Sequence, residues 1–225
     1  MFKKNNSIII IAIVIVCCVI MSFIDAVIKP QYMIKSLIKI FLFLICPIIF
    51  SIYNKNIDIK NLFKVNKKGF TVAILAGISI FVIILGAYFT IGNFFDLSNI
   101  TLALTNNIGV NKENFLWVAI YISFVNSLLE EFFFRGFSFL TLKRSTTKKI
   151  AYIFSSLAFA LYHVAMMIGW FDIILFTLSL SALFVGGLIF NYFNEKYGNI
   201  YISWLIHMFA NFAINGIGFI LFNII

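Results

Sequence analysis

The chain has 225 residues, of which 63% are hydrophobic and only 11% are charged. A soluble domain is nearer half apolar and a quarter charged, so this composition excludes a soluble globular enzyme and indicates a helical membrane protein. The formal net charge of +9 is not read as nucleic-acid binding, because the lysines lie in short segments between apolar runs. In that position basic residues set membrane topology and contact anionic lipid, so no nucleic-acid partner is expected.

About 20 consecutive apolar residues cross a bilayer as one helix. On that measure the chain is predicted to be an all-α bundle of about seven spans, forming one integral-membrane domain over residues 1–225. The predicted spans cover residues 7–25, 33–53, 70–92, 115–140, 150–168, 172–193 and 200–223. The first is too long for the apolar part of a signal peptide and is expected to be retained as a span. The connection 93–114 is long enough for a short interfacial helix.

The basic residues predict the orientation of the bundle, with the N-terminus in the cytoplasm. The inside segments then carry twelve of the seventeen: Lys3, Lys4, Lys55, Lys60, Lys64, Lys67, Lys68, Lys143, Arg144, Lys148, Lys149 and Lys196. The outside segments and their edges carry Lys29, Lys35, Lys39 and Lys112, and we expect the outside residues Asp25, Asp96 and Asp172 to be solvated caps. An eighth span would invert the part of this topology that follows it. The Ile-, Phe-, Asn- and Lys-rich composition favours a bacterial cell membrane.

Six polar residues are predicted to lie at similar depth in three of these spans. They are Glu130, Glu131, Arg135, His163, His207 and Asn211, and the two histidines are the only ones in the chain. Counted from the predicted cytoplasmic ends at about 1.5 Å per residue, the acidic, imidazole and amide groups lie about 10–20 Å deep. Ionisable groups inside a membrane are costly and usually mark functional sites. We therefore expect the three spans to bring these residues together.

The spacing of these residues predicts how they divide. His207 and Asn211 are separated by four positions and share a helix face, as do Glu131 and Arg135 in the order that favours an ion pair. Glu130 is turned by about 100° from its neighbour. The simplest arrangement pairs Glu131 with Arg135 and leaves Glu130 free to face a cavity with the histidines. The structural alternative is a buried charge network that only fixes helix packing.

Three short motifs carry a family resemblance. Glu130 to Arg135 reads E-E-F-F-F-R and resembles the E-E-x-x-x-R motif of the CAAX-prenyl-protease and bacteriocin-processing (CPBP, or Abi) intramembrane proteases. Phe159 to His163 resembles their F-x-x-x-H motif, and His207 to Asn211 resembles their H-x-x-x-N motif. The resemblance covers roughly residues 115–215, a CPBP-like catalytic core, and implies an intramembrane endopeptidase. Residues 1–110 carry no family signature.

Peptide hydrolysis needs an activated water, an acid for the leaving amine and donors to the oxyanion. Glu130 is the best candidate for the base, and His163 can hold the water and shuttle its proton. His207 and Asn211 can donate to the oxyanion, the role that the resemblance also implies for them. Glu131 also belongs to the catalytic set, where it and Arg135, like Phe159, are expected to orient the site.

A metal-dependent mechanism fits the same residues. Glu130, His163 and His207 would form a His₂Glu zinc site with an open position for water, and Glu131 or Glu130 would then act as the base. The resembling family has been described both as metalloproteases and as metal-free glutamate proteases. No H-E-x-x-H helix is present and the ligand set is sparse, so the metal-free glutamate mechanism is favoured.

The resemblance implies a hydrophobic peptide or lipidated protein as substrate, such as a prenylated tail, a bacteriocin leader or a pheromone precursor. A bacterial source favours a peptide precursor. The first alternative is a non-catalytic membrane partner, either a bacteriocin self-immunity protein or a sensor-kinase scaffold. The second is a proton-coupled transporter, because a Glu/His set at depth is also a proton relay. The inverted repeats and broken helix pairs expected of such a transporter are not evident in the sequence.

Overall fold

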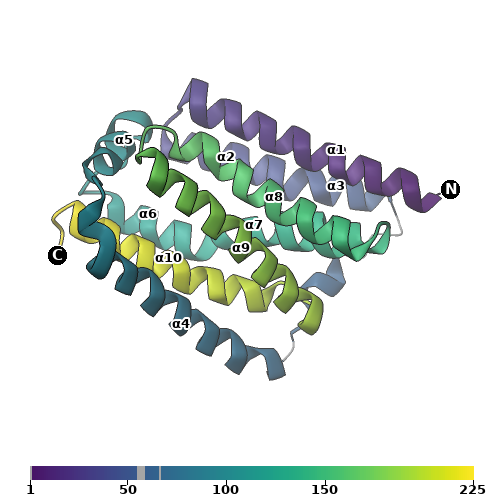
Figure 1. Cartoon of the computed structure of the whole chain (residues 1–225). Helices are drawn as coiled ribbons and strands as arrows, with labels where there is room; N and C mark the ends of the chain where they lie inside the picture. Colours follow the sequence, from purple (N-terminus) through teal and green to yellow (C-terminus); the bar gives the residue numbers. More distant parts are fainter. Residues whose placement is uncertain (1, 55–58, 66) are drawn as a thin grey trace.

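A computed structural model describes residues 2–54, 59–65 and 67–225, and within these residues it contains helices and no strands (Figure 1). Lys55, one of the predicted inside lysines, lies outside the described residues. The α-helices are α1 (Phe2–Phe23), α2 (Tyr32–Ile40), α3 (Cys46–Tyr53), α4 (Lys67–Ile91), α5 (Ser98–Ile108), α6 (Phe115–Tyr121), α7 (Ser127–Glu130), α8 (Lys148–Met167), α9 (Ile173–Tyr197) and α10 (Tyr201–Leu221). The π-helical segments are η1 (Ile24–Ile28), η2 (Phe41–Ile45), η5 (Ile122–Asn126) and η6 (Glu131–Thr141). The short 3₁₀ segments are η3 (Lys60–Phe63), η4 (Gly92–Phe94) and η7 (Leu142–Arg144).

Seven helical stretches among the described residues are long and apolar enough to cross a membrane, which confirms the predicted number. They are Asn6–Ile28, Tyr32–Tyr53, Gly69–Phe94, Phe115–Arg144, Lys148–Met167, Ile173–Tyr197 and Tyr201–Leu221. Helices satisfy their backbone hydrogen bonds internally, and in lipid only such elements or closed barrels are stable. The protein is therefore a multi-pass integral membrane protein.

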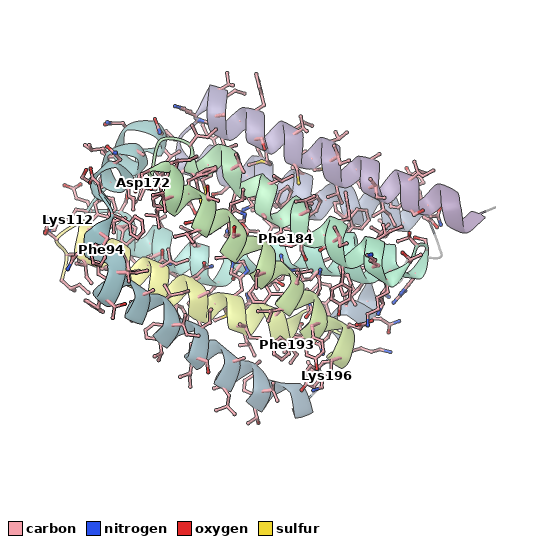
Figure 2. The ribbon with its side chains drawn as sticks, viewed as in Figure 1. Phe94, Lys112, Asp172, Phe184, Phe193 and Lys196 are labelled. Atoms are coloured by element: carbon pink, nitrogen blue, oxygen red, sulfur yellow. The ribbon has the colours of Figure 1, made fainter. Side chains whose placement is uncertain are left out.

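The spans run back and forth, so the N- and C-termini lie at opposite ends of the bundle (Figure 1). Lys196 lies at one of these ends, and Lys112 and Asp172 lie at the other (Figure 2). The short helix expected in the connection 93–114 is α5, which lies at the same end as Lys112. At the opposite end Gly198, with a φ of 71°, ends α9 and lets the chain reverse into α10.

Of the three aspartates expected to be caps, Asp172 is the N-cap of α9, whereas the N-cap position of α5 is Leu97 and Asp96 precedes it. The Asp172 carboxylate accepts hydrogen bonds from the backbone N–H groups that open α9, and Asp96 accepts one from Ser98. The prediction for Asp25 is wrong, because this residue is buried and its Oδ1 lies 2.6 Å from Lys35 Nζ. The first span continues through the π-helical turn η1, so Asp25 lies within the helix and not at its end.

The central span Phe115–Arg144 positions the polar residues. It is interrupted by η5 and η6, and every residue of η6 is buried. A helix that is covered on all sides belongs to the core of a bundle, and η6 packs against α1, η2, α8 and α9. The rings of Phe133 and Phe43 stack with centroids 4.0 Å apart, which ties η6 to η2. π-helical turns are rare and often occur at functional sites.

Candidate active site

Glu130 lies at the junction of α7 and η6 and is the centre of the polar cluster. Its Oε1 accepts a hydrogen bond from Lys39 Nζ at 2.5 Å and another from Asn126 Nδ2 at 3.0 Å. Its Oε2 faces two imidazoles, at 3.9 Å from His163 Nε2 and 3.8 Å from His207 Nε2. These two distances are longer than a direct hydrogen bond, and a single water molecule could bridge polar atoms at this separation. The two oxygens of Glu130 therefore have different surroundings.

Both histidines are oriented by hydrogen bonds at Nδ1. His163 Nδ1 donates to the backbone oxygen of Phe159 at 2.7 Å, and His207 Nδ1 donates to Glu131 Oε1 at 2.9 Å. Because Nδ1 carries the donated proton, the neutral form of each ring has its lone pair on Nε2. Each imidazole thus presents to Glu130 a nitrogen that can accept a proton or hold a water.

Glu131 connects Arg135 to His207. Its second oxygen, Oε2, lies 3.5 Å from Arg135 Nε, so the predicted i, i+4 ion pair is present. The Arg135 guanidinium is fully buried between two aromatic faces, 3.9 Å from the ring centroid of Phe159 and 4.9 Å from that of Phe190. Cation–π contacts of this kind stabilise a desolvated cation. Phe159 therefore supports the site twice, through its ring and through its backbone oxygen.

Asn211 lies in the same region but is bound to a different element. Its Nδ2 donates to the backbone oxygen of Ile122, in η5, at 3.1 Å. The primary amide carries two N–H groups, and this contact uses one of them. One turn later Asn215 donates to Ser123 Oγ at 3.0 Å. These amides fasten α10 against the central span, which fixes the height of His207.

Further hydrogen bonds hold the helices of the site in register. Ser155 Oγ, on α8, donates to the backbone oxygen of Phe134 at 2.7 Å. Trp204 Nε1, on α10, lies 3.0 Å from Ser127 Oγ. Buried hydrogen bonds between membrane helices contribute modest stability, but they fix rotation and depth. The helices that carry His163 and His207 are both tied in this way to the helix that carries Glu130.

Sequence reasoning missed two residues of this cluster. Glu130 was predicted to be free to face a cavity with the histidines, but Lys39 and Asn126 both donate hydrogen bonds to it. The lysine was assigned to the outside edge of the second span, but its side chain is buried in the bundle. Two signals were available: a lysine seven residues inside a predicted span, and an asparagine four residues before Glu130 on the same helix face.

The residues were also tested as a metal site. Zinc binds nitrogen and oxygen at about 2.0–2.2 Å, which places tetrahedral ligand atoms roughly 3.4 Å apart. The Nε2 atoms lie farther than this from Glu130 Oε2, and the lysine ammonium already occupies Oε1. No group of three or more His, Cys, Asp and Glu in the described part of the chain is placed to hold a metal ion. The arrangement does not fit the His₂Glu zinc site that was considered as the alternative mechanism.

The family was identified by comparison with known proteins. Residues 112–213 match the family model described as Rce1-like, type II CAAX prenyl endopeptidase. This range contains all three motifs, which confirms the resemblance found in the sequence, and it leaves Lys39 outside. No curated protein and no solved structure matches the chain.

Proposed function

Residues 112–213 form a domain of the Rce1-like type II CAAX prenyl endopeptidase family, and on this premise we propose that the protein is an intramembrane endopeptidase. Its substrate is a membrane-associated peptide precursor or a lipidated protein. The observation that carries the proposal is the position of Glu130, whose Oε2 faces the Nε2 atoms of His163 and His207 at 3.9 and 3.8 Å. A water held among these three atoms would have Glu130 Oε2 as its proton acceptor and His163 Nε2 as the group that orients it.

The first step is removal of a proton from this water. Glu130 Oε2 accepts the proton while the water oxygen attacks the peptide carbonyl carbon, and His163 Nε2 holds the water in place. The C–O bond that forms converts the carbonyl into a tetrahedral oxyanion. Glu130 lies 3% exposed in the bundle, and exclusion of bulk water strengthens each of these electrostatic contacts.

The second step is collapse of the tetrahedral intermediate. His207 enters the reaction as the imidazolium, so its Nε2–H and the second N–H of Asn211 donate hydrogen bonds to the oxyanion, and His207 keeps its proton throughout. Glu131 accepts the hydrogen bond from His207 Nδ1–H without taking the proton, and its negative charge stabilises the imidazolium, as the aspartate does in a serine-protease triad. The C–N bond then breaks, and the leaving amine receives the proton that Glu130 took from water, directly or through His163.

Cleavage assays in proteoliposomes test the proposal. The substrates are peptide precursors with bacteriocin-type or pheromone-type leaders and peptides with lipidated C-terminal tails. We expect Glu130→Gln to lower kcat by about 10²–10⁴-fold, because the amide cannot accept the proton from water. The matched control is Glu113→Gln, which makes the same change at an exposed glutamate before α6 and leaves the rate unchanged.

Two results would contradict this proposal. The first is cleavage by Glu130→Gln at the rate of the unsubstituted protein. The second is the absence of cleavage of every substrate class by folded, unsubstituted protein, together with a cellular phenotype that Glu130→Gln does not alter. That second outcome would favour the non-catalytic membrane partner, either an immunity protein or a scaffold.

A further inference from the structure

Lys39 is a buried cation at the centre of the bundle. It lies on α2, outside the residues that match the family, and its side chain is 6% exposed. A buried lysine without a partner is energetically costly, so the groups that contact the Lys39 ammonium indicate what stabilises it there. Its Nζ lies 2.5 Å from Glu130 Oε1 and 2.6 Å from Asn126 Oδ1. The ammonium also lies 4.9 Å from the centroid of the Tyr162 ring, within reach of a cation–π contact.

Lys39, Asn126 and Glu130 form a closed set of contacts. Asn126 accepts from the lysine through Oδ1 and donates through Nδ2 to the same Glu130 Oε1, at 3.0 Å. Rotation about the last bond of a glutamate side chain is broad and roughly two-fold, so an unrestrained carboxylate does not hold one oxygen toward one partner. Two donors on Oε1 remove that freedom and leave Oε2 toward the imidazoles.

We propose that Lys39 is a positioning residue, which fixes the Glu130 carboxylate with Oε1 bound and Oε2 facing His163 and His207. The inference rests on the proposed function, because it assigns Lys39 a part in presenting the base. Asn126 serves the same purpose from within the central span. The N-terminal part of the chain thereby completes a site whose other members all lie in the family domain.

Lys35 provides a matched comparison on the same helix. It lies four residues before Lys39, is also buried, and its Nζ lies 2.6 Å from Asp25 Oδ1. Both lysines therefore form buried ion pairs of similar length from α2. Only the pair formed by Lys39 includes a carboxylate that faces the histidines. A purely structural role would make loss of either lysine similar in its effect on turnover.

The experiment compares Lys39→Met, Lys39→Arg and Lys35→Met in the proteoliposome cleavage assay. We expect Lys39→Met to lower kcat by about 10²-fold with KM changed by less than about threefold, because small misplacement of a reacting group has costs of this size. Lys39→Arg, which keeps a charged donor, should recover most of the loss. Lys35→Met should keep kcat within about threefold of the unsubstituted protein.

A second variant covers the case in which Lys39→Met does not accumulate in membranes. Lys39→Gln keeps a hydrogen-bond donor without the charge, and we expect a kcat about tenfold lower. Turnover by Lys39→Met or Lys39→Gln equal to that of the unsubstituted protein overturns the inference and leaves the proposed function standing. An equal loss in Lys35→Met also overturns it. Absence of cleavage by the unsubstituted protein overturns the proposed function and the inference with it.

Discussion

Glu130 and Glu131 are adjacent in the chain and are both buried, yet they contact different sides of the bundle. Glu130 is held by Lys39 from α2 and faces both imidazole Nε2 atoms. Glu131 contacts His207 Nδ1 and Arg135 Nε, on the far side of the same imidazole. Two glutamates that are neighbours in the chain therefore have different positions: Glu130 faces the Nε2 atoms of both imidazoles, and Glu131 contacts His207 from its Nδ1 side.

This difference follows from the helices that each carboxylate meets. Glu130 ends α7, where Lys39 reaches it from α2, whereas Glu131 begins η6, which outside its own span packs most extensively against α8 and α9. Each carboxylate is balanced by its own cation, so the pair does not repel as two bare charges in low dielectric would. Two adjacent acids can therefore take two roles in a mechanism, one in proton transfer and one in orienting a histidine.

After Glu130→Gln itself, the largest effect is expected at His163, which lies on the Glu130 side of the site. His163→Ala removes the nitrogen that lies 3.9 Å from Glu130 Oε2, so in the proposed mechanism the attacking water would lose one of its contacts. We expect kcat to fall by about 10²–10³-fold, the usual contribution of a group that holds or transfers the proton. Cleavage is measured on protein shown by immunoblot to accumulate in membranes. Full retention of cleavage would remove His163 from the mechanism.

A smaller loss of activity is expected from a substitution of Glu131 than from substitutions on the Glu130 side. Glu131→Gln keeps an oxygen that can accept from His207 Nδ1 but removes the charge that stabilises its imidazolium. We expect kcat to fall about 10–10²-fold with little change in KM, less than for Glu130→Gln. The control is Glu195→Gln, whose carboxylate pairs with Lys143 at 3.2 Å and Lys148 at 2.7 Å away from the site. A loss in Glu131→Gln as large as in Glu130→Gln would contradict the division of roles.

The sequence was sufficient to predict the number of spans and the family that the motif region resembles. A run of about 20 apolar residues has few stable states in lipid other than a spanning helix, so span number follows from length alone. The four-residue spacings of Glu131 with Arg135 and of Phe159 with His163 produce contacts within one helix, and both contacts are present. Local periodicity predicts such contacts because it concerns one element at a time.

Lys39 and Asp25 were misplaced because their partners come from other helices or from a local change of helix type. Lys39 pairs with a residue 91 positions away, and nothing in the apolar run around it identifies that partner. Asp25 was placed at a helix end because the π-helical turn η1 has no signature in hydrophobic periodicity. Both errors moved a buried charge to the surface, where a charged residue is ordinarily found.

The smallest effect is expected from metal removal. This experiment tests whether Glu130 and Glu131 act with protein side chains only, without a bound metal ion. The Lys39 ammonium, 2.5 Å from Glu130, already neutralises the negative carboxylate charge that would attract a divalent cation. We therefore expect a strong chelator to change the cleavage rate by less than about twofold, and added zinc to give no activation. Metal content of the purified protein, measured by mass spectrometry, should be well below one ion per chain. A loss of activity on chelation that zinc restores, with one ion bound per chain, would show that the carboxylate and imidazoles rearrange around a metal and that Lys39 then has another partner.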